Sequence, residues 1–199
     1  MLAQAGFPNG FSEVTVLPLD DAGNVMLDAE GEKVPLTLFW MPTTRPYNPD
    51  GEGIGQAMAA DLAAIGINVQ LENAGDWATY LDRRRNGELI GLYQLGWTGD
   101  NGDPDNFFFL RGCSGARAGG QNITKWCNKE FDELLVKARS TSDMAARTAA
   151  YEKMQVIMKE EAPDMTIAHS IVNDAAAANL TGYKMSPLGG HHFKGVDLQ

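Results

Sequence analysis

Up to Met158, the spacing of apolar residues alternates between every second position and every third or fourth position. This alternation constrains the fold more than any other feature of the chain. Three stretches place them at every second position, which is typical of strands with one buried face; they contain Val14 and Val16, then Val34, Leu36, Leu38 and Trp40, then Ile67, Val69 and Leu71. Four stretches place them three or four positions apart, as amphipathic helices do; they are Ile54, Met58, Leu62 and Ile65; Trp77, Tyr80 and Leu81; Phe131, Leu134, Leu135 and Ala138; and Tyr151, Met154, Ile157 and Met158. Alternating strands and helices predict an α/β lobe with a mixed sheet that helices cover.

The ends of the expected helices carry residues that suit them. Asp50 and Ser142 precede helical stretches, where a side-chain oxygen accepts a hydrogen bond from a free backbone N–H. Gly66 and Gly87 follow helical stretches, where a left-handed residue is common. The acidic, glycine-bearing stretch from Asp20 to Lys33 is expected to be an exposed hairpin or loop.

Composition narrows the classes of function. The 199 residues are 44% hydrophobic, which is enough for a sizeable core. The formal charge of −10 repels nucleic acid phosphates and anionic lipid surfaces, so neither is an expected partner. No run of about 20 apolar residues is present to span a bilayer.

Two cysteines, Cys113 and Cys127, flank a polar, glycine-rich stretch that is flexible enough to close into a loop. A disulfide is the favoured interpretation, because closing a loop of about 15 residues is worth roughly 3 kcal/mol in the chain-entropy model. Two unpaired buried thiols are one alternative. A metal site is another, although no histidine or further cysteine lies nearby. Only the disulfide would imply an oxidising compartment.

A carboxylate in a glycine-flanked loop marks the candidate binding site. The apolar run from Leu89 to Trp97 is expected to be a buried strand, and Asp100 follows it between Gly99 and Gly102. Asp100 would therefore lie at the end of a strand, facing a cleft, where it can hold a cation. The alternative is a turn in which this carboxylate bonds its own backbone.

This loop and several other segments together resemble the bacterial peptide and nickel solute-binding proteins of family 5, and in particular the members that bind dipeptides. The resemblance covers nearly the whole chain and keeps the order of the family; it is carried by Leu-Ala-Gln-Ala-Gly-Phe-Pro-Asn-Gly-Phe at 2–11, Met-Pro-Thr-Thr-Arg-Pro-Tyr-Asn-Pro at 41–49, Gly-Trp-Thr-Gly-Asp-Asn-Gly-Asp-Pro-Asp-Asn-Phe-Phe-Phe at 96–109, Thr-Lys-Trp-Cys at 124–127, Ala-Pro-Asp-Met-Thr-Ile-Ala-His-Ser at 162–170 and Gly-Tyr-Lys-Met-Ser-Pro-Leu-Gly-Gly-His-His-Phe at 182–193.

The resemblance implies a periplasmic-binding-protein-like lobe of type II within a longer protein. Residues 1–178 would form the ligand-binding lobe, incomplete at its N-terminus, and residues 179–199 a tail that crosses to the missing N-terminal lobe. Such proteins are periplasmic receptors of ABC importers. They bind dipeptides or short peptides, deliver them to membrane permeases and use no cofactor. The signal peptide would lie outside this C-terminal fragment, and contact with the membrane would be only through the transporter.

Five residues are candidates for the site, and the resemblance gives a role to two of them. Asp100 matches the aspartate that holds the α-amino group of a peptide, and Arg45 matches the arginine that meets the terminal carboxylate. An arginine suits that task because its planar fork can donate two parallel hydrogen bonds. Trp97, Thr98 and Gly99 would offer backbone groups to an extended peptide, as an added strand does. The gap between the two charges would then select peptide length.

Two functions from other classes remain as alternatives. Asp103 and Asp105 raise the possibility of a calcium-stabilised extracellular module, although the spacing does not fit an EF-hand and Asp105 could instead cap a short helix. A hydrolase could use Asp100 and Asp103 as paired carboxylates. No other catalytic constellation is supported, since His169 and Ser170 would point to opposite faces of an expected strand.

Overall fold

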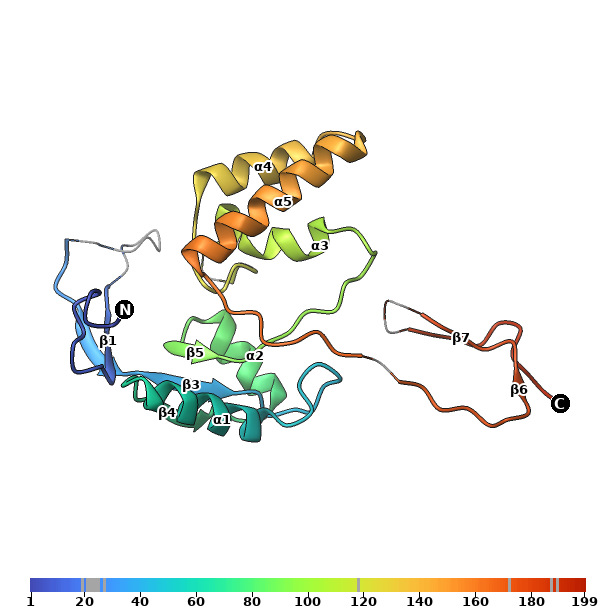
Figure 1. The fold of residues 1–199 in the computed structure, drawn as a ribbon, viewed down its shortest axis with the longest axis horizontal. Coiled ribbons are helices and arrows are strands. Elements are labelled where there is room, and N and C mark those ends of the chain that lie inside the picture. The colour runs from blue at the N-terminus through green and yellow to red at the C-terminus, as the bar shows by residue number, and fades with distance from the viewer. Residues whose placement is uncertain are drawn as a thin grey trace.

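The chain forms a sheet part (residues 11–93), a helical part (residues 105–161) and a C-terminal tail (residues 179–199) (Figure 1). The computed structural model describes residues 1–18, 20, 26, 28–117, 119–171, 173–186, 188 and 190–199. Helices and strands alternate through the sheet part, so the predicted α/β class is confirmed.

A parallel sheet is the centre of the sheet part. Strand β3 (Thr37–Trp40) lies between β4 (Gln70–Asn73) and β5 (Gly91–Tyr93), and both pairings are parallel. Helix α1 (Gly51–Ala64) connects β3 to β4, and helix α2 (Trp77–Arg85) connects β4 to β5. Phe39 packs in a core cluster with Tyr80 of α2, while its neighbours Leu38 and Trp40 face Gly55 of α1. Because successive residues of a strand point to opposite faces, the two helices cover opposite faces of the sheet.

Helix α1 turns a glycine face toward the sheet rather than its apolar stripe. Its buried residues are Gly51 and Gly55, and a Cβ at Gly51 would lie 2.2 Å from the carbonyl oxygen of Met41. The predicted stripe is only half-buried at Ile54, Met58 and Leu62, and exposed at Ile65. The helix itself is confirmed, with Asp50 accepting a hydrogen bond from the Gly53 N–H at 2.9 Å. The helix is followed by Gly66 at φ +89°.

Antiparallel pairing occurs in a separate hairpin. Strand β1 (Glu13–Val16) pairs with β2 (Glu32–Pro35), which runs almost directly into β3. The single strand expected from Val34 to Trp40 is therefore divided at Leu36, where the chain leaves one sheet and enters the next. Residues 21–25 and 27 of the predicted loop lie outside the described residues, and Glu32 and Lys33 belong to β2.

The edge strands are shorter and more exposed than the sequence predicts. Leu71 of β4 is 39% exposed, so the expected buried face of this strand is wrong. The strand expected over Leu89–Trp97 is formed only as β5, although Leu89 itself is buried. A period of two reports how side chains alternate, but it carries no information about whether another layer covers the face of an edge strand.

Two long helices make the core of the helical part. Helices α4 (Lys129–Arg139) and α5 (Met144–Glu161) pack together, preceded by the short α3 (Asp105–Phe108), η1 (Phe109–Arg111) and η2 (Cys113–Gly115). Both predicted apolar stripes face this core, which contains Phe131, Leu135, Ala138, Ala150, Tyr151, Met154 and Ile157. The expected cap of α5 is one residue off, because Asp143 and not Ser142 accepts hydrogen bonds from the N–H groups of Ala145 and Ala146.

Beyond α5 the chain is extended and then forms two small antiparallel pairs. The strand expected at His169 and Ser170 is absent from the described structure, and both residues are exposed. The tail pairs β6 (Leu180–Thr181) with β9 (Asp197–Leu198), and β7 (Lys184–Met185) with β8 (His191–His192). It projects away from the rest of the molecule (Figure 1).

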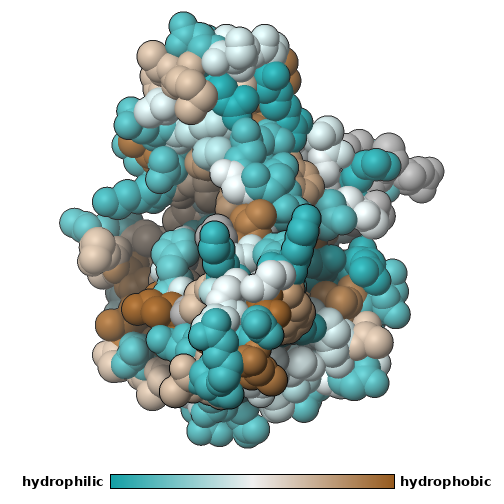
Figure 2. Space-filling view, turned by 90° about the vertical axis from the view of Figure 1, so that its right-hand side faces the viewer, coloured by the Kyte–Doolittle hydropathy of each residue, from teal (hydrophilic) through white to brown (hydrophobic). Residues whose placement is uncertain are grey.

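The tail has little core of its own. Phe193 is 70% exposed and Leu188 is also exposed, while Tyr183 and Val196 are half-buried. From the side that carries the tail, hydrophobic residues appear as separate patches among hydrophilic ones (Figure 2). None of the helices in the described part of the chain is long and apolar enough to cross a membrane.

Replacing Phe131 by alanine is expected to destabilise the protein by about 3 to 5 kcal/mol, because this side chain is fully buried between α4 and α5. Val136→Ala is the matched control on the same helix; Val136 is 63% exposed, so a change within about 0.5 kcal/mol is expected. Urea unfolding measures both. Equal losses of stability in the two variants would contradict the assignment of the core.

Candidate functional site

The two loops that carry the candidate residues leave the same edge of the sheet. Residues 41–50 follow β3, and residues 94–104 follow β5, which pairs with β3 in parallel. Ligands of open α/β sheets commonly bind outside the carboxyl ends of the strands. The topology therefore brings Arg45 and Asp100 to one edge, although 55 positions separate them in the sequence (100 − 45).

The side chain of Gln94 ties these loops together. This residue is buried, and its Oε1 accepts hydrogen bonds from the Met41 N–H at 3.2 Å and from Asn48 Nδ2 at 2.9 Å. Its Nε2 donates to the carbonyl oxygen of Gly51 at 3.0 Å. One amide thus fixes the start of the first loop at Met41, its later part at Asn48 and the beginning of α1 at Gly51.

Tyr47 and Gly96 bring the loops into direct contact. A Cβ added at Gly96 would lie 2.2 Å from Cε2 of Tyr47, so the phenol ring packs against bare backbone. Burial raises the pKa of Tyr47, and the nearby charge of Arg45 opposes this rise. The contact lies two residues beyond Arg45 in one loop and one residue before Trp97 in the other.

Arg45 is half-buried, and its guanidinium carbon lies 4.6 Å from the centre of the Trp77 ring. A cation over an indole face is stabilised by roughly 0.5 to 2 kcal/mol. Within the described residues Arg45 forms no ion pair; the nearby acid Asp50 caps α1 instead. This contact orients the guanidinium, and no described acid neutralises its charge.

Asp100 is exposed and interacts with Asn106. Asn106 Nδ2 donates to Asp100 Oδ2 at 3.1 Å, and the Asp100 N–H donates to Asn106 Oδ1 at 3.0 Å. In the described part of the chain no cationic group pairs with Asp100. The expected alternative, in which the carboxylate bonds its own backbone, is not what the structure shows.

The next two acids along the chain, one at the end of this loop and one at the start of α3, are already paired. Asp103 accepts from Arg147 Nη2 at 2.7 Å, and Asp105 accepts from Arg139 Nε at 2.6 Å. Asp105 does not cap α3 as expected; its backbone N–H instead donates to Asp103 Oδ1 at 2.9 Å. Of these three acids, Asp100 is thus the one that no described cationic group pairs with. Among the described residues no group of three acidic, histidine or cysteine side chains is arranged to hold a metal.

Residues 97–99 present free backbone beside Asp100. Trp97 is 38% exposed, its indole N–H donates to Asn106 Oδ1 at 2.8 Å, and its ring meets Phe109 edge to face at 6.0 Å. Thr98 is exposed and Gly99 half-buried. Their main-chain N–H and C=O groups have no hydrogen-bond partner within the described residues, so they remain available to an added extended chain.

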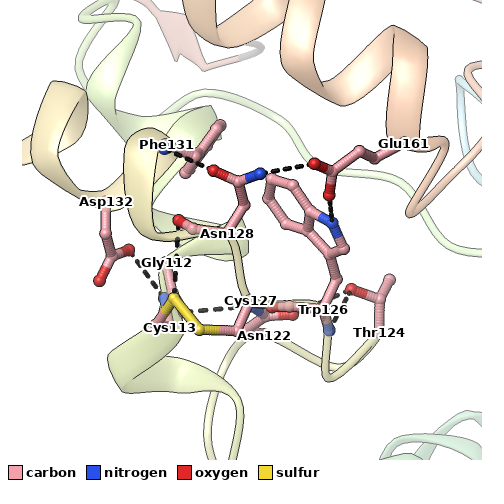
Figure 3. The surroundings of a disulfide bond; sticks show 10 residues. All are labelled: Gly112, Cys113, Asn122, Thr124, Trp126, Cys127, Asn128, Phe131, Asp132 and Glu161. Atoms are coloured by element: carbon pink, nitrogen blue, oxygen red, sulfur yellow. Dashed lines mark hydrogen bonds between the residues drawn. A yellow bond between two sulfur atoms is a disulfide. The ribbon is translucent and has the colours of Figure 1, made fainter.

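The predicted disulfide between Cys113 and Cys127 is confirmed, and Figure 3 shows how its loop is held. The buried amide of Asn122 donates to the carbonyl oxygens of Gly112 at 3.1 Å and Trp126 at 2.7 Å. Further anchors lie on the helices: Cys113 N–H donates to Asp132, and Glu161 accepts from the Trp126 indole and from Asn128. The disulfide thus belongs to the helical part and supports the segment between α3 and α4.

Three residues that organise the site were not singled out in the sequence: Gln94, Tyr47 and Asn106. Gln94 is a polar residue inside an apolar strand run, which is a detectable signal of a buried hydrogen-bonding role. Asn106 lies in the first turn of a helix directly after the glycine-rich loop. Nothing in the local sequence identifies Tyr47 as the ring that packs on Gly96.

Comparison with known proteins assigns the family. Residues 1–118 match the family described as bacterial extracellular solute-binding proteins, family 5 middle. This chain belongs to that family.

Three relatives illustrate the similarity. The dipeptide-binding protein of Escherichia coli (strain K12) is 40% identical over 164 residues, which are 82% of this chain and 30% of that protein. Heme-binding protein A of Haemophilus influenzae is 34% identical over 100% of this chain and 31% of its own length. The crystal structure of a dipeptide binding protein from Pseudoalteromonas sp. SM9913 in complex with Met-Leu has a TM-score of 0.70 and 34% identity, covering 82% of this chain and 32% of that one. The chain thus spans about a third of the length of these relatives.

Gly96→Ala is expected to destabilise the protein by about 1 to 3 kcal/mol, because the new methyl group would collide with the Tyr47 ring. Adding Tyr47→Ala should recover part of that loss, since it empties the space; a double-mutant cycle in thermal or urea unfolding measures the coupling. Gly190→Ala is the control, because a Cβ there would meet no atom of the described residues closer than 3.9 Å. Additive effects at Gly96 and Tyr47 would refute the contact between the loops.

Proposed function

We propose that this chain is the ligand-binding lobe of a receptor for an ABC importer, which binds dipeptides or short peptides by their charged ends. One observation carries the proposal: Arg45 and Asp100 carry opposite charges, have no ion-pair partner within the described residues, and lie on two touching loops. The receptor would deliver its peptide to the membrane permeases of the importer.

A free peptide is a zwitterion, so its selective capture needs one group of each sign. The α-ammonium group would meet Asp100, the terminal carboxylate would meet Arg45, and the peptide backbone would lie along residues 97–99. A charge pair at 4 Å contributes about 4 kcal/mol before desolvation at an effective dielectric near 20. A further residue would displace the carboxylate by about 3.3 to 3.6 Å, so the spacing of the clamps would select length.

The ligands in the names of the relatives support a peptide as the ligand of this chain, and they also suggest one alternative ligand. The relatives from E. coli and Pseudoalteromonas are named for dipeptides, and the latter holds Met-Leu. Haem is the alternative, because heme-binding protein A matches along the whole chain. The propionates of haem would suit Arg45, but its organic framework carries no ammonium group for Asp100. The pair of opposite charges therefore favours the peptide.

We further propose that the receptor performs no reaction on its ligand and works outside the cytoplasm. The family and the relatives named above are binding proteins. The disulfide fits an oxidising compartment such as the periplasm. Nothing found supports the calcium module or the hydrolase, since Asp103 and Asp105 are engaged with arginines.

Within this proposal, residues 1–178 form the lobe and residues 179–199 cross to an opposing lobe that the chain does not contain. The coverage of about a third of each relative supports such a division. Two-lobed binders close around their ligands. The isolated chain is therefore expected to bind peptides weakly, and binding is best measured on the full-length protein that contains it.

Asp100→Asn in that full-length protein is expected to weaken alanyl-alanine binding by about 2 to 5 kcal/mol, because it leaves the peptide ammonium group without its anion. Arg45→Met should cause a loss of the same order at the carboxylate end. Asp61→Asn, an exposed acid on α1, is the control and should bind as the unmodified protein does. Calorimetry measures all four proteins.

Two further ligands complete the experiment. Trialanine should bind more weakly than alanyl-alanine if the clamps measure length, and hemin should not compete with the dipeptide. Undiminished dipeptide binding in Asp100→Asn, or displacement of the dipeptide by hemin with Arg45 intact, would overturn the proposed function.

A further inference from the structure

We infer that Asn106 is a positioning residue that orients Asp100 and Trp97 for the ammonium end of a peptide; this inference rests on the function proposed above. Asn106 need not touch the ligand. Its carboxamide makes three hydrogen bonds, and all of them go to the two residues that flank the proposed ammonium site.

The contacts use both ends of the amide. Asn106 Oδ1 accepts from the Trp97 indole at 2.8 Å and from the Asp100 N–H at 3.0 Å, while Nδ2 donates to Asp100 Oδ2 at 3.1 Å. This orientation of the amide follows from the chemistry, because the reverse orientation would set an NH2 group against two N–H donors. The indole, the backbone and the carboxylate are therefore held by one side chain.

Asp100 keeps a free oxygen in this arrangement. Oδ2 accepts the hydrogen bond from Asn106, while no described residue donates to Oδ1. The carboxylate also keeps its charge, because the amide is a neutral donor. A ligand ammonium group would thus meet an oxygen whose direction is already set, without first displacing a cation. Such preorganisation lowers the entropy lost when the ligand binds.

Asn106 derives its own position from the helical part. It lies on α3, where its neighbour Asp105 pairs with Arg139 of α4, and Phe108 packs against Tyr151 of α5 with ring centres 5.0 Å apart. Asp103, just before α3, pairs with Arg147 of α5. Asp100 follows the sheet part along the chain, so Asn106 couples its orientation to a second, separately packed core.

The test is a double-mutant cycle with a change in the ligand. Binding of alanyl-alanine and of lactoyl-alanine, in which a hydroxyl group replaces the α-ammonium group, is measured by calorimetry for the full-length protein and for Asn106→Ala. We expect Asn106→Ala to weaken alanyl-alanine binding by roughly ten- to a hundredfold, the worth of a hydrogen bond to a charged group. Binding of lactoyl-alanine should change by less than about threefold, which is under about 0.7 kcal/mol.

A spectroscopic measurement reports the positioning directly. The indole N–H resonance of Trp97 should move in Asn106→Ala, because its acceptor is removed, while those of Trp40, Trp77 and Trp126 stay in place. Asn101→Ala is the matched control: this asparagine lies in the same loop and, among the described residues, accepts only from the Asp103 N–H, so the preference for the ammonium ligand should persist. Asn106→Ser is the second variant, with the same expected loss, should the alanine variant not fold.

The possible outcomes distinguish a failure of the role inferred for Asn106 from a failure of the proposed peptide-binding function. Equal losses of affinity for both ligands in the Asn106 variants would mean that Asn106 only supports the loop, and the inference would fail while dipeptide binding stood. An unchanged affinity for alanyl-alanine would also overturn it. If the unmodified protein bound both ligands equally, the proposed ammonium site would itself be wrong, and the role of Asn106 would fall with it.

Discussion

The need to satisfy one buried amide organises the edge of the sheet on which the candidate site depends. Gln94 lies where β5 ends, and a buried polar group without a partner costs about 1 to 3 kcal/mol. Its side chain finds partners at Met41, Asn48 and Gly51, which lie in the other loop and at the start of α1. Its main-chain oxygen accepts from the Tyr80 hydroxyl at 2.6 Å. Separate segments are therefore placed relative to each other by a single residue.

The helical part anchors the loop that follows β5, which the sheet alone does not do. The loop after β5 is rich in glycine and polar residues, so it has little packing of its own. The ion pairs of Asp103 with Arg147 and Asp105 with Arg139 fasten the end of that loop to α4 and α5. Those helices are in turn held together by a core that includes Phe131 and Met154. The core between α4 and α5 thus anchors, through these ion pairs, the end of the loop that carries Asp100.

The sequence predicted elements whose stability is local or follows a clear period. Helices α4 and α5, the Asp50 cap and the disulfide were all predicted, because apolar stripes, caps and cysteine pairs act over short stretches. The buried face of α1 was missed, since a glycine face produces no hydrophobic signal. The contact of Tyr47 with Gly96 was missed for a related reason: only the three-dimensional meeting of two loops reveals why that backbone must be bare.

Arg45 and Asp100 are held by neutral partners, so their charges remain available to a ligand although the chain has many ion pairs. Arg45 is held by the face of an indole and Asp100 by a carboxamide, and both partners are neutral. A charged partner would orient these groups equally well, but a ligand would then have to break an ion pair before it could bind. A neutral partner fixes direction and leaves the field of the charge intact. This difference separates Asp100 from Asp103 and Asp105, which lie close to it in the sequence: those two carboxylates form ion pairs that hold the fold, whereas no described cationic group pairs with Asp100.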